Sequence, residues 1–385
     1  MDQKGEWLSD ALRTTFHFRK WNGVKFEGLT GAKGYMSQIL RAYPDWEGER
    51  LPESFIIKIP TYSMAVEKAI DIPIDDENDD ECQKTTLLIK IFHRTESKIY
   101  ELFEQLEAPP VPIPRVYFNR NSSGTRNNEF SVLVMEDLRK YSTVDIVVGF
   151  NDIQMYAIVD AIVDLHVYSF THNGWESIGF SLQEIRETES MATIVAALAD
   201  RLKQRSPYHF GKIDLLMELL GKDDWSERYF VSCRNGEIIC ALAHGDLWSE
   251  NIMWEGNTLR AIIDWQLAHC ASITEDIMRV LSTCVSVTSR KRLTKPLLTY
   301  YYKQLKNKMA DCGKTLPFTF ADVEDSYRST LLYTAAMTIF AAAVWSNSTV
   351  LKDGSANETK RINEIFDRTK SILEEAIETI SMSLS

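Results

Sequence analysis

Apolar and polar positions follow different patterns in the two parts of the chain, and the change falls near residue 137. Before it, short apolar runs such as 55–59 and 130–135 stop at proline or acidic residues, which is typical of buried strands. Two stretches of this part, 1–20 and 85–107, instead have the spacing of helices. After residue 138, helical spacing dominates, over 155–171, 190–204, 213–220, 277–286, 296–309, 320–345 and 358–381.

This division predicts an α+β protein with two lobes. We expect a β-rich N-terminal lobe over residues 1–137 and a mostly helical C-terminal lobe over residues 138–385. At 385 residues, the chain is long enough for each lobe to bury a core of its own. The acidic stretch 71–81 matches no calcium-loop spacing, so we interpret it as a solvated loop rather than a metal site.

Three short strands interrupt the helical pattern of the second part. They are predicted at 238–242, 251–254 and 259–263, and a Glu-Gly-Asn turn separates the last two. This order places Asp246 and Asn251 on the loop between the first two strands, and Asp264 at the end of the third.

The polar residues of this loop are those that metal-assisted phosphoryl transfer needs. Asp246 can orient an attacking hydroxyl and accept its proton, while the amide oxygen of Asn251 and the carboxylate of Asp264 suit Mg²⁺. A hairpin rich in turn-forming residues, with His244 as an ordinary loop histidine, is the alternative. The regular order of the three polar residues favours phosphoryl transfer.

The run His-Gly-Asp-Leu-Trp-x-x-Asn at 244–251, followed by Ile-Asp-Trp-Gln at 263–266, resembles a known catalytic loop. It is similar to that of the choline kinase and aminoglycoside phosphotransferase superfamily, and to its CHK-kinase-like branch, which includes the ecdysteroid-kinase-like proteins. The resemblance implies a bilobal protein-kinase-like fold and transfer of phosphate from ATP, with Mg²⁺, to a small-molecule hydroxyl. It also implies that Asp246 is the catalytic base and that Asn251 and Asp264 are metal ligands.

Three glycines near the N-terminus could cover the phosphates of a nucleotide. Gly28, Gly31 and Gly34 are spaced so that backbone N–H groups can approach an anion closely. Their spacing departs from the Gly-x-Gly-x-x-Gly of protein kinases, and a flexible hairpin turn is the alternative.

Lys58 is the candidate for the lysine that binds the phosphates. It lies between two isoleucines on a predicted strand, where an unpaired ammonium would be costly, so it needs a partner. Glu96, at the start of a helical Glu-x-x-x-Tyr segment, resembles the glutamate that pairs with this lysine in the family. Lys90 is a rival for the lysine, and Glu101 and Glu104 are rivals for the glutamate.

The remaining site predictions also come from the resemblance. Met135, Glu136 and Leu138 correspond to the linker where adenine docks through backbone groups. His244, Trp248 and Asp276 are expected to support the catalytic loop structurally, since a carboxylate near a helix start suits free N–H groups.

Composition limits the class of partner. The formal net charge of −12 argues against nucleic-acid binding. The six cysteines have no zinc-type spacing, the N-terminus has no apolar signal core, and the longest apolar stretch, 331–345, is short of the roughly 20 residues of a membrane span. We therefore expect a cytoplasmic protein without a membrane span.

The acceptor is the point that the sequence does not identify. The aromatic residues Tyr300 to Tyr302, Tyr333, Phe340 and Trp345 are candidates for binding it, although core packing is the usual role of such residues. The resemblance implies a sterol-like or other lipophilic alcohol, or a choline-like one. A catalytically silent relative that binds a nucleotide and acts as a scaffold is the second hypothesis. A protein kinase is less favoured, because no Asp-Phe-Gly follows the loop.

Overall fold

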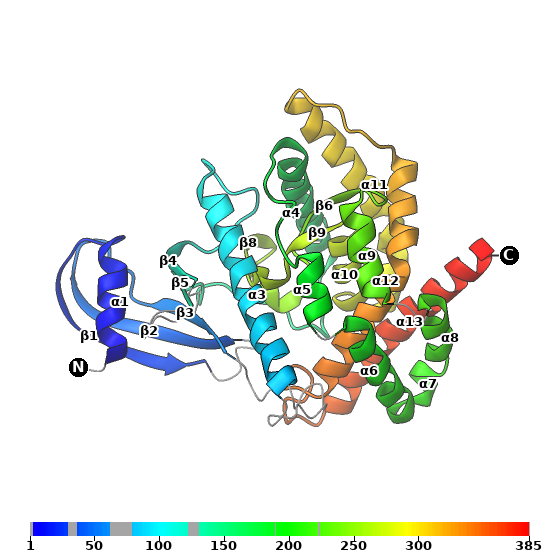
Figure 1. Ribbon diagram of the computed structural model, residues 1–385, viewed down its shortest axis with the longest axis horizontal. Coiled ribbons are helices and arrows are strands. Elements are labelled where there is room, and N and C mark those ends of the chain that lie inside the picture. Colours follow the sequence, from blue (N-terminus) through cyan, green and yellow to red (C-terminus); the bar gives the residue numbers. More distant parts are fainter. Residues whose placement is uncertain are drawn as a thin grey trace.

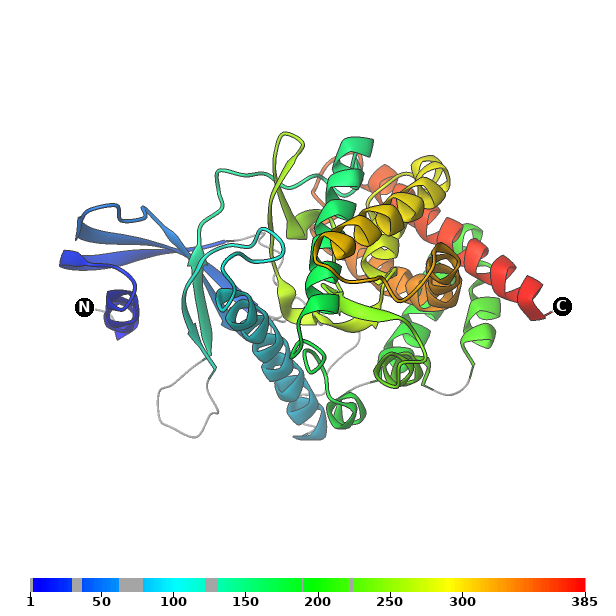
Figure 2. The same cartoon turned by 90° about the horizontal axis from the view of Figure 1, so that it is seen from above.

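The computed structural model describes residues 3–29, 37–61, 79–121, 131–188, 190–221 and 224–384. A strand-rich lobe and a helical lobe lie side by side, with the two ends of the chain at opposite extremes of the molecule (Figure 1; Figure 2). The predicted α+β fold class is thus confirmed: an antiparallel sheet comes first, and a mostly helical region follows it.

The N-terminal lobe is built on one five-stranded antiparallel sheet, ordered β1-β2-β3-β5-β4. Its strands are β1 (Phe18–Gly28), β2 (Ser37–Gly48), β3 (Phe55–Pro60), β4 (Val116–Arg120) and β5 (Val132–Glu136). Strand alternation divides β3 between two faces: Phe55 and Ile57 join an apolar cluster under helix α1 (Gln3–Arg13), while Ile56 and Lys58 face the opposite side. The position of Lys58 therefore follows from the period of two.

Helix α3 (Asp79–Glu104) lies between the sheet and the helical lobe (Figure 2). The prediction of a loop over 71–81 is wrong for 79–81, which form the first turn of this helix; residues 71–78 lie outside the described part. Ile99 and Phe103 of α3 are buried in the core of the C-terminal lobe. This packing joins α3 to the helical lobe while its other side faces the sheet, so Glu96 can reach β3.

The C-terminal lobe contains the predicted helices, with boundaries close to those expected. They are α4 (Asp152–Thr171), α6 (Met191–Arg205), α8 (Ile213–Leu220), α10 (Glu275–Thr283), α11 (Val287–Asp311), α12 (Phe320–Ser346) and α13 (Glu358–Leu384). Three short helices were not predicted: α5 (Leu182–Glu187), α7 (Pro207–Phe210) and α9 (Trp225–Arg234).

One predicted boundary in this lobe is wrong for a clear physical reason. We expected a helix to begin at Pro296, but α11 starts nine residues earlier, where the side chain of Ser286 accepts a hydrogen bond from the N–H of Ser289. Leu293 and Leu297 are buried on either side of the proline. Their packing outweighs the hydrogen bond that a proline inside a helix removes.

Two small antiparallel pairs carry the loop of the predicted site. Strand β6 (Cys240–Ala243) pairs with β9 (His269–Ser272), and β7 (Ile252–Glu255) pairs with β8 (Thr258–Ile262). The three predicted strands are present, and β9 is an addition. Two single turns of 3₁₀ helix belong to the motif. The first, η1 (Ser249–Asn251), ends the segment 244–251, and the second, η2 (Trp265–Leu267), directly follows Asp264.

Helix α12 is long and strongly apolar. By length and composition it could cross a membrane, but 72% of its most apolar window is buried inside the protein. It packs against α13, α6 and α10, so its apolar character serves the core of the lobe.

Candidate active site

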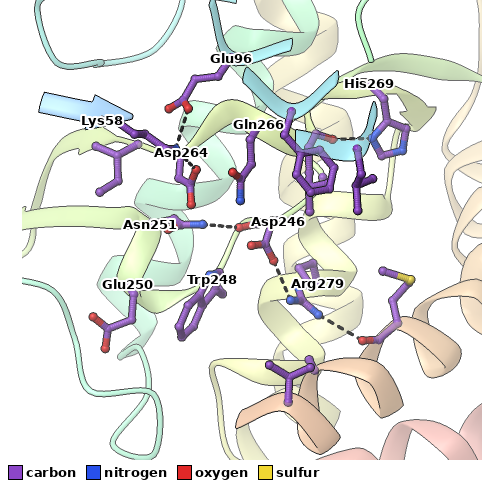
Figure 3. A pocket seen from close by; sticks show the side chains of 18 of the residues that line it. Lys58, Glu96, Asp246, Trp248, Glu250, Asn251, Asp264, Gln266, His269 and Arg279 are labelled. Carbon is purple, nitrogen blue, oxygen red and sulfur yellow. Dashed lines mark hydrogen bonds and ion pairs between the residues drawn. The ribbon is translucent and has the colours of Figure 1, made fainter. Parts of the chain in front are cut away.

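A cavity of about 610 Å³ lies between the two lobes. One part, here called the sheet side, is lined by residues of the N-terminal lobe, the linker and the motif: Leu29, Ile39, Arg41, Ile56, Lys58, Glu96, Met135, Glu136, Asp137, Leu138, Arg139, Asn251 and Asp264. The other part, here called the helix side, is lined by Phe180, Ile185, Met191, Ile194, Ser226, Phe230, His269, Glu275, Arg279, Tyr333, Thr334, Met337, Phe340, Ala341, Val344 and Trp345. Asp246 lies where the two sides meet (Figure 3).

On the sheet side, Lys58 lies between two carboxylates. Its Nζ atom is 2.6 Å from Oε2 of Glu96 and 2.5 Å from Oδ1 of Asp264. Burial alone would lower the pKa of Lys58, but the carboxylates of Asp264 and Glu96 together raise it, so the lysine is charged. Burial raises the pKa of Glu96 in turn.

The rivals of these two residues point elsewhere. Lys90 is exposed on α3, eleven residues after the start of a continuous helix rather than on a strand. Glu101 and Glu104 are also exposed, and Glu101 accepts a hydrogen bond from Asn119. Lys58 and Glu96 are the pair that the fold brings together.

The conformation of the catalytic loop depends on Gly245. Its φ of +78° lies in the left-handed region, and a Cβ there would stand 2.2 Å from the carbonyl oxygen of Leu267. Only glycine fits this close approach. This left-handed turn at Gly245 orients the chain so that Asp246 faces the cavity.

His244 ties the loop to the strand that leads to Asp264. Its Nε2 atom lies 2.9 Å from the carbonyl oxygen of Ile263, and its Nδ1 atom accepts a hydrogen bond from the backbone N–H of Asp246. The N–H of Ile263 also donates to the carbonyl oxygen of Asn251. The buried side chain of His244 and this backbone hydrogen bond together connect the segments that carry Asp246, Asn251 and Asp264.

Asp276 binds the loop rather than its own helix. Its two carboxylate oxygens accept hydrogen bonds from the backbone N–H groups of His244 and Gly245, at 2.7 and 3.0 Å. The prediction that Asp276 supports the catalytic loop is therefore confirmed, and the N–H groups that it binds belong to the loop rather than to the start of its own helix. Burial raises the pKa of Asp276, against the opposing effect of these bonds.

Asp246 is paired with Arg279, a residue that the sequence reasoning missed. Nη2 of Arg279 lies 2.7 Å from Oδ1 of Asp246 (Figure 3). The guanidinium also lies over the ring of Trp345, 5.3 Å from the ring centroid. A signal was available: Arg279 lies three residues after Asp276, on the same face of α10, so both face the loop.

Asn251 and Asp264 could hold a metal ion. The Nδ2 atom of Asn251 donates to the carbonyl oxygen of Asp246, so its amide oxygen is the atom left for a cation. Asp264 has a φ of +67°, which is unusual for any residue except glycine, and such strain is often kept at functional sites. The described residues contain no group of three or more His, Cys, Asp or Glu that could hold a metal ion.

The linker residues line the cavity as expected. Met135 and Leu138 are buried, and Glu136 is half-buried at the end of β5. The segment is anchored by Asp137, whose carboxylate accepts hydrogen bonds from Arg41 at 2.7 Å and from Ser54 at 2.6 Å. This brace fixes the linker at one edge of the cavity.

Of the three glycines predicted to cover the nucleotide phosphates, the structure describes Gly28. Gly28 ends β1 with no other atom near its hypothetical Cβ and no left-handed φ, so its geometry does not require glycine. Gly31 and Gly34 lie outside the described residues. A phosphate-covering role for the three glycines stays a prediction.

The helix side is mainly apolar, and it includes some of the predicted aromatic residues. Tyr333, Phe340 and Trp345 line it, all on α12. The run Tyr300 to Tyr302 on α11 does not line the cavity: Tyr301, for instance, is buried against His166, 2.7 Å from its Nδ1. Trp248 of the motif packs on Trp345 at 4.8 Å and closes the wall.

A second ion pair lies in the wall of the helix side. His269 and Glu275 are both buried, with Nε2 and Oε1 3.4 Å apart, and Oε2 of Glu275 accepts a hydrogen bond from Tyr229. Burial alone would lower the pKa of His269, but the carboxylate of Glu275 raises it to about 9. The imidazole is therefore a cation at neutral pH.

The sheet and the helical lobe, with the charged residues between them, define a protein-kinase-like fold. The structure of a choline kinase from Cryptosporidium parvum Iowa II matches with a TM-score of 0.53 at 12% identity, over 94% of this chain and 93% of that chain. At this identity, the likeness establishes the fold alone.

Sequence comparisons define the family. The uncharacterized kinase-like protein D1044.1 of Caenorhabditis elegans is 26% identical over 382 residues, which cover 93% of this chain and 94% of that protein. The family model DUF1679, described as uncharacterized oxidoreductase dhs-27, matches residues 6–384. This chain therefore belongs to the DUF1679 family of CHK-like kinases.

The protein dhs-27 itself is longer. This chain is 25% identical to the C. elegans protein over 336 residues, which are 84% of this chain but only 40% of dhs-27. The word oxidoreductase in that name belongs to a protein of which this chain spans less than half.

Proposed function

We propose that this protein is an ATP- and Mg²⁺-dependent kinase that transfers the γ-phosphoryl group to the hydroxyl of a lipophilic small molecule. The observation that carries the proposal is the convergence on Lys58. Two carboxylates, 38 residues and 206 residues away in the sequence, meet its Nζ atom within 2.6 Å. Phosphoryl transfer requires such a cluster of fixed charges beside a base.

On the sheet side, the nucleotide would exchange partners with this cluster. The phosphates would replace Asp264 on Lys58, while Glu96 keeps the lysine in place. The freed carboxylate of Asp264 and the amide oxygen of Asn251 would then hold Mg²⁺, which neutralises charge on the phosphates. Adenine would dock against the linker between Met135 and Leu138.

On the helix side, the acceptor hydroxyl would approach Asp246. Arg279 occupies Oδ1 of that carboxylate, so the other oxygen is the one proposed to orient the hydroxyl and accept its proton. Apolar side chains such as Phe230, Met337 and Phe340 form most of the remaining wall. They suit a lipophilic alcohol, because burial of its apolar surface supplies the binding energy.

The direct test is to find a phosphorylated product. The purified chain would be incubated with isotope-labelled ATP, Mg²⁺ and a metabolite extract, and mass spectrometry would search for products that gain one labelled phosphoryl group. We expect such a product only when ATP, Mg²⁺ and protein are all present. Failure to form any product from several extracts, by a protein that binds ATP, would contradict the proposal.

One observation favours a second candidate, a silent relative that binds a nucleotide without transferring phosphate. The ion pair between Asp246 and Arg279 occupies one oxygen of the proposed base. Thermal stabilisation by ATP in a protein that forms no product would support this candidate. The intact Asn251 and Asp264 argue for the kinase.

A further inference from the structure

The charges of the helix side balance within the protein. Among its described residues, and with Asp246 at its edge, each carboxylate has a cation of this chain as partner: Asp246 has Arg279 at 2.7 Å, and Glu275 has His269 at 3.4 Å. Glu250 of the motif also lines the cavity, where its carboxylate accepts a hydrogen bond from the hydroxyl of Thr143 at 3.3 Å. A positively charged alcohol on the helix side would therefore find both Asp246 and Glu275 already paired with cations of this protein.

Two aromatic rings of the same wall, Trp345 and Tyr333, already contact other side chains. A cation can bind over an aromatic face, but the guanidinium of Arg279 already covers one face of Trp345 at 5.3 Å. Tyr333 is stacked on Tyr229, with 4.0 Å between ring centroids. One face of Trp345 and one face of Tyr333 are thus unavailable to a quaternary amine.

Arg279 makes this arrangement selective. Its side chain is only 12% exposed and holds Asp246 at the meeting point of the two sides of the cavity. A second cation nearby would meet a like charge in a poorly screened place, which is unfavourable. An anionic group would interact favourably with the charge of Arg279, and a neutral group would interact with it only weakly.

We infer that Arg279 determines the charge class of the acceptor: it excludes alcohols that carry a positive charge and admits apolar alcohols that are neutral or anionic. The inference rests on the proposed function only in assigning the helix side to the acceptor. It separates this protein from kinases of cationic alcohols such as choline.

The test measures binding, so it does not depend on turnover. Three straight-chain alcohols of equal length, ending in a second hydroxyl, a carboxylate or a trimethylammonium group, would be titrated into the full chain by calorimetry. We expect wild-type protein to bind the trimethylammonium probe more weakly than the neutral probe, by on the order of tenfold or more. Equal affinity for these two probes, or no binding of any of the three, would overturn the inference.

Variants then assign the effect to Arg279. Arg279→Gln should remove the discrimination against the cationic probe, and Arg279→Lys should keep it, since the charge is retained. Asp246→Asn leaves Arg279 without its counter-charge and should strengthen the discrimination. If Arg279→Gln does not fold cooperatively, the affinities measured for wild type and Asp246→Asn still test the inference. It requires that wild type bind the cationic probe more weakly than the neutral probe, and that Asp246→Asn increase this difference.

Arg205→Gln is the matched control. Arg205 also stacks on an aromatic ring, Phe366 at 5.5 Å, and donates to Ser346 at 2.9 Å, but it does not line the cavity. Its substitution should leave the ratio of the three affinities unchanged.

Two outcomes separate the inference from the kinase proposal. An unchanged ratio of affinities in folded Arg279→Gln would overturn the role given to Arg279. The expected ratios of affinities in a protein that transfers no phosphate would reject only the kinase proposal.

Discussion

The two sides of the cavity are built in different ways. The sheet side depends on a few charged groups with fixed partners, such as Lys58 between Glu96 and Asp264. The helix side depends on many apolar side chains from several helices, and its few charges cancel one another in pairs. The difference teaches that phosphate chemistry demands particular residues, while an apolar wall can be made from many combinations of residues.

The largest effect on stability and ATP binding is expected on the sheet side, when its central cation, Lys58, is removed. In Lys58→Met, two neighbouring carboxylates lose their shared partner, and breaking such a buried pair costs about 3–5 kcal/mol. We expect the free energy of unfolding to fall by this amount, together with loss of ATP binding. Urea denaturation and calorimetry would measure the two effects. Lys90→Met, on the exposed side of α3, is the control and should change neither; similar behaviour of the two variants would contradict the cluster.

The junction of the two sides should be nearly as sensitive. In Gly245→Ala, the new Cβ would meet a backbone oxygen at 2.2 Å, and we expect destabilisation of about 3 kcal/mol or more. Gly236→Ala is a matched control, because that glycine has a similar φ of +73° but no atom within 4 Å of the Cβ position. Its cost should be about 1–2 kcal/mol, from the backbone conformation alone. Equal costs in denaturation experiments would show that the close approach at Gly245 is not important.

The helix side should show a pH dependence of its own. The pKa of His269 is about 9 in the folded protein and about 6.5 in the unfolded chain, so its stabilising pair with Glu275 is fully present below about pH 6.5 and is lost as the pH rises through 9. Glu275→Gln should therefore destabilise the protein by up to about 3 kcal/mol near pH 6, and by much less near pH 10. Denaturation at both pH values would measure the difference. A cost that does not change with pH would contradict the pairing.

The smallest expected effect sharpens the comparison between the two sides. Phe340→Ala on the helix side should raise the KM of the acceptor, and Ile56→Ala on the sheet side should raise the KM of ATP, each by about tenfold for the lost apolar contact. Steady-state kinetics with both substrates varied would separate the two effects. If either variant changes both KM values equally, the assignment of the two sides is wrong.

The sequence predicted the charged residues of the sheet side and the motif better than the residues of the helix side. The cost of an unpaired ammonium between two isoleucines singled out Lys58, and the motif spacing located Asp246, Asn251 and Asp264, because these residues have chemistry that no other residue type supplies. Arg279 escaped notice because its partner is 33 residues away and becomes its neighbour only when α10 packs under the loop.

Local capping and packing explain the other misses. The start of α11 depends on a cap at Ser286 that outweighs the signal of Pro296. The sequence predicted that Asp276 supports the catalytic loop, but not that its partners are the N–H groups of His244 and Gly245. Tyr300 to Tyr302 were proposed for the acceptor from composition alone, and only the tertiary packing shows that they face away from the cavity. Aromatic side chains have the same pattern in a core and in a binding wall, so the sequence does not separate the two.

The central claim is that Asp246 acts on the acceptor hydroxyl while Lys58 and its partners hold the nucleotide. The most direct measurement compares product formation and ATP affinity in wild type and in Asp246→Asn. The account predicts a rate of phosphoryl transfer lower by about 10²–10⁴-fold with ATP affinity largely unchanged. Transfer at a rate near that of wild type would contradict the role of Asp246, and with it the proposed mechanism.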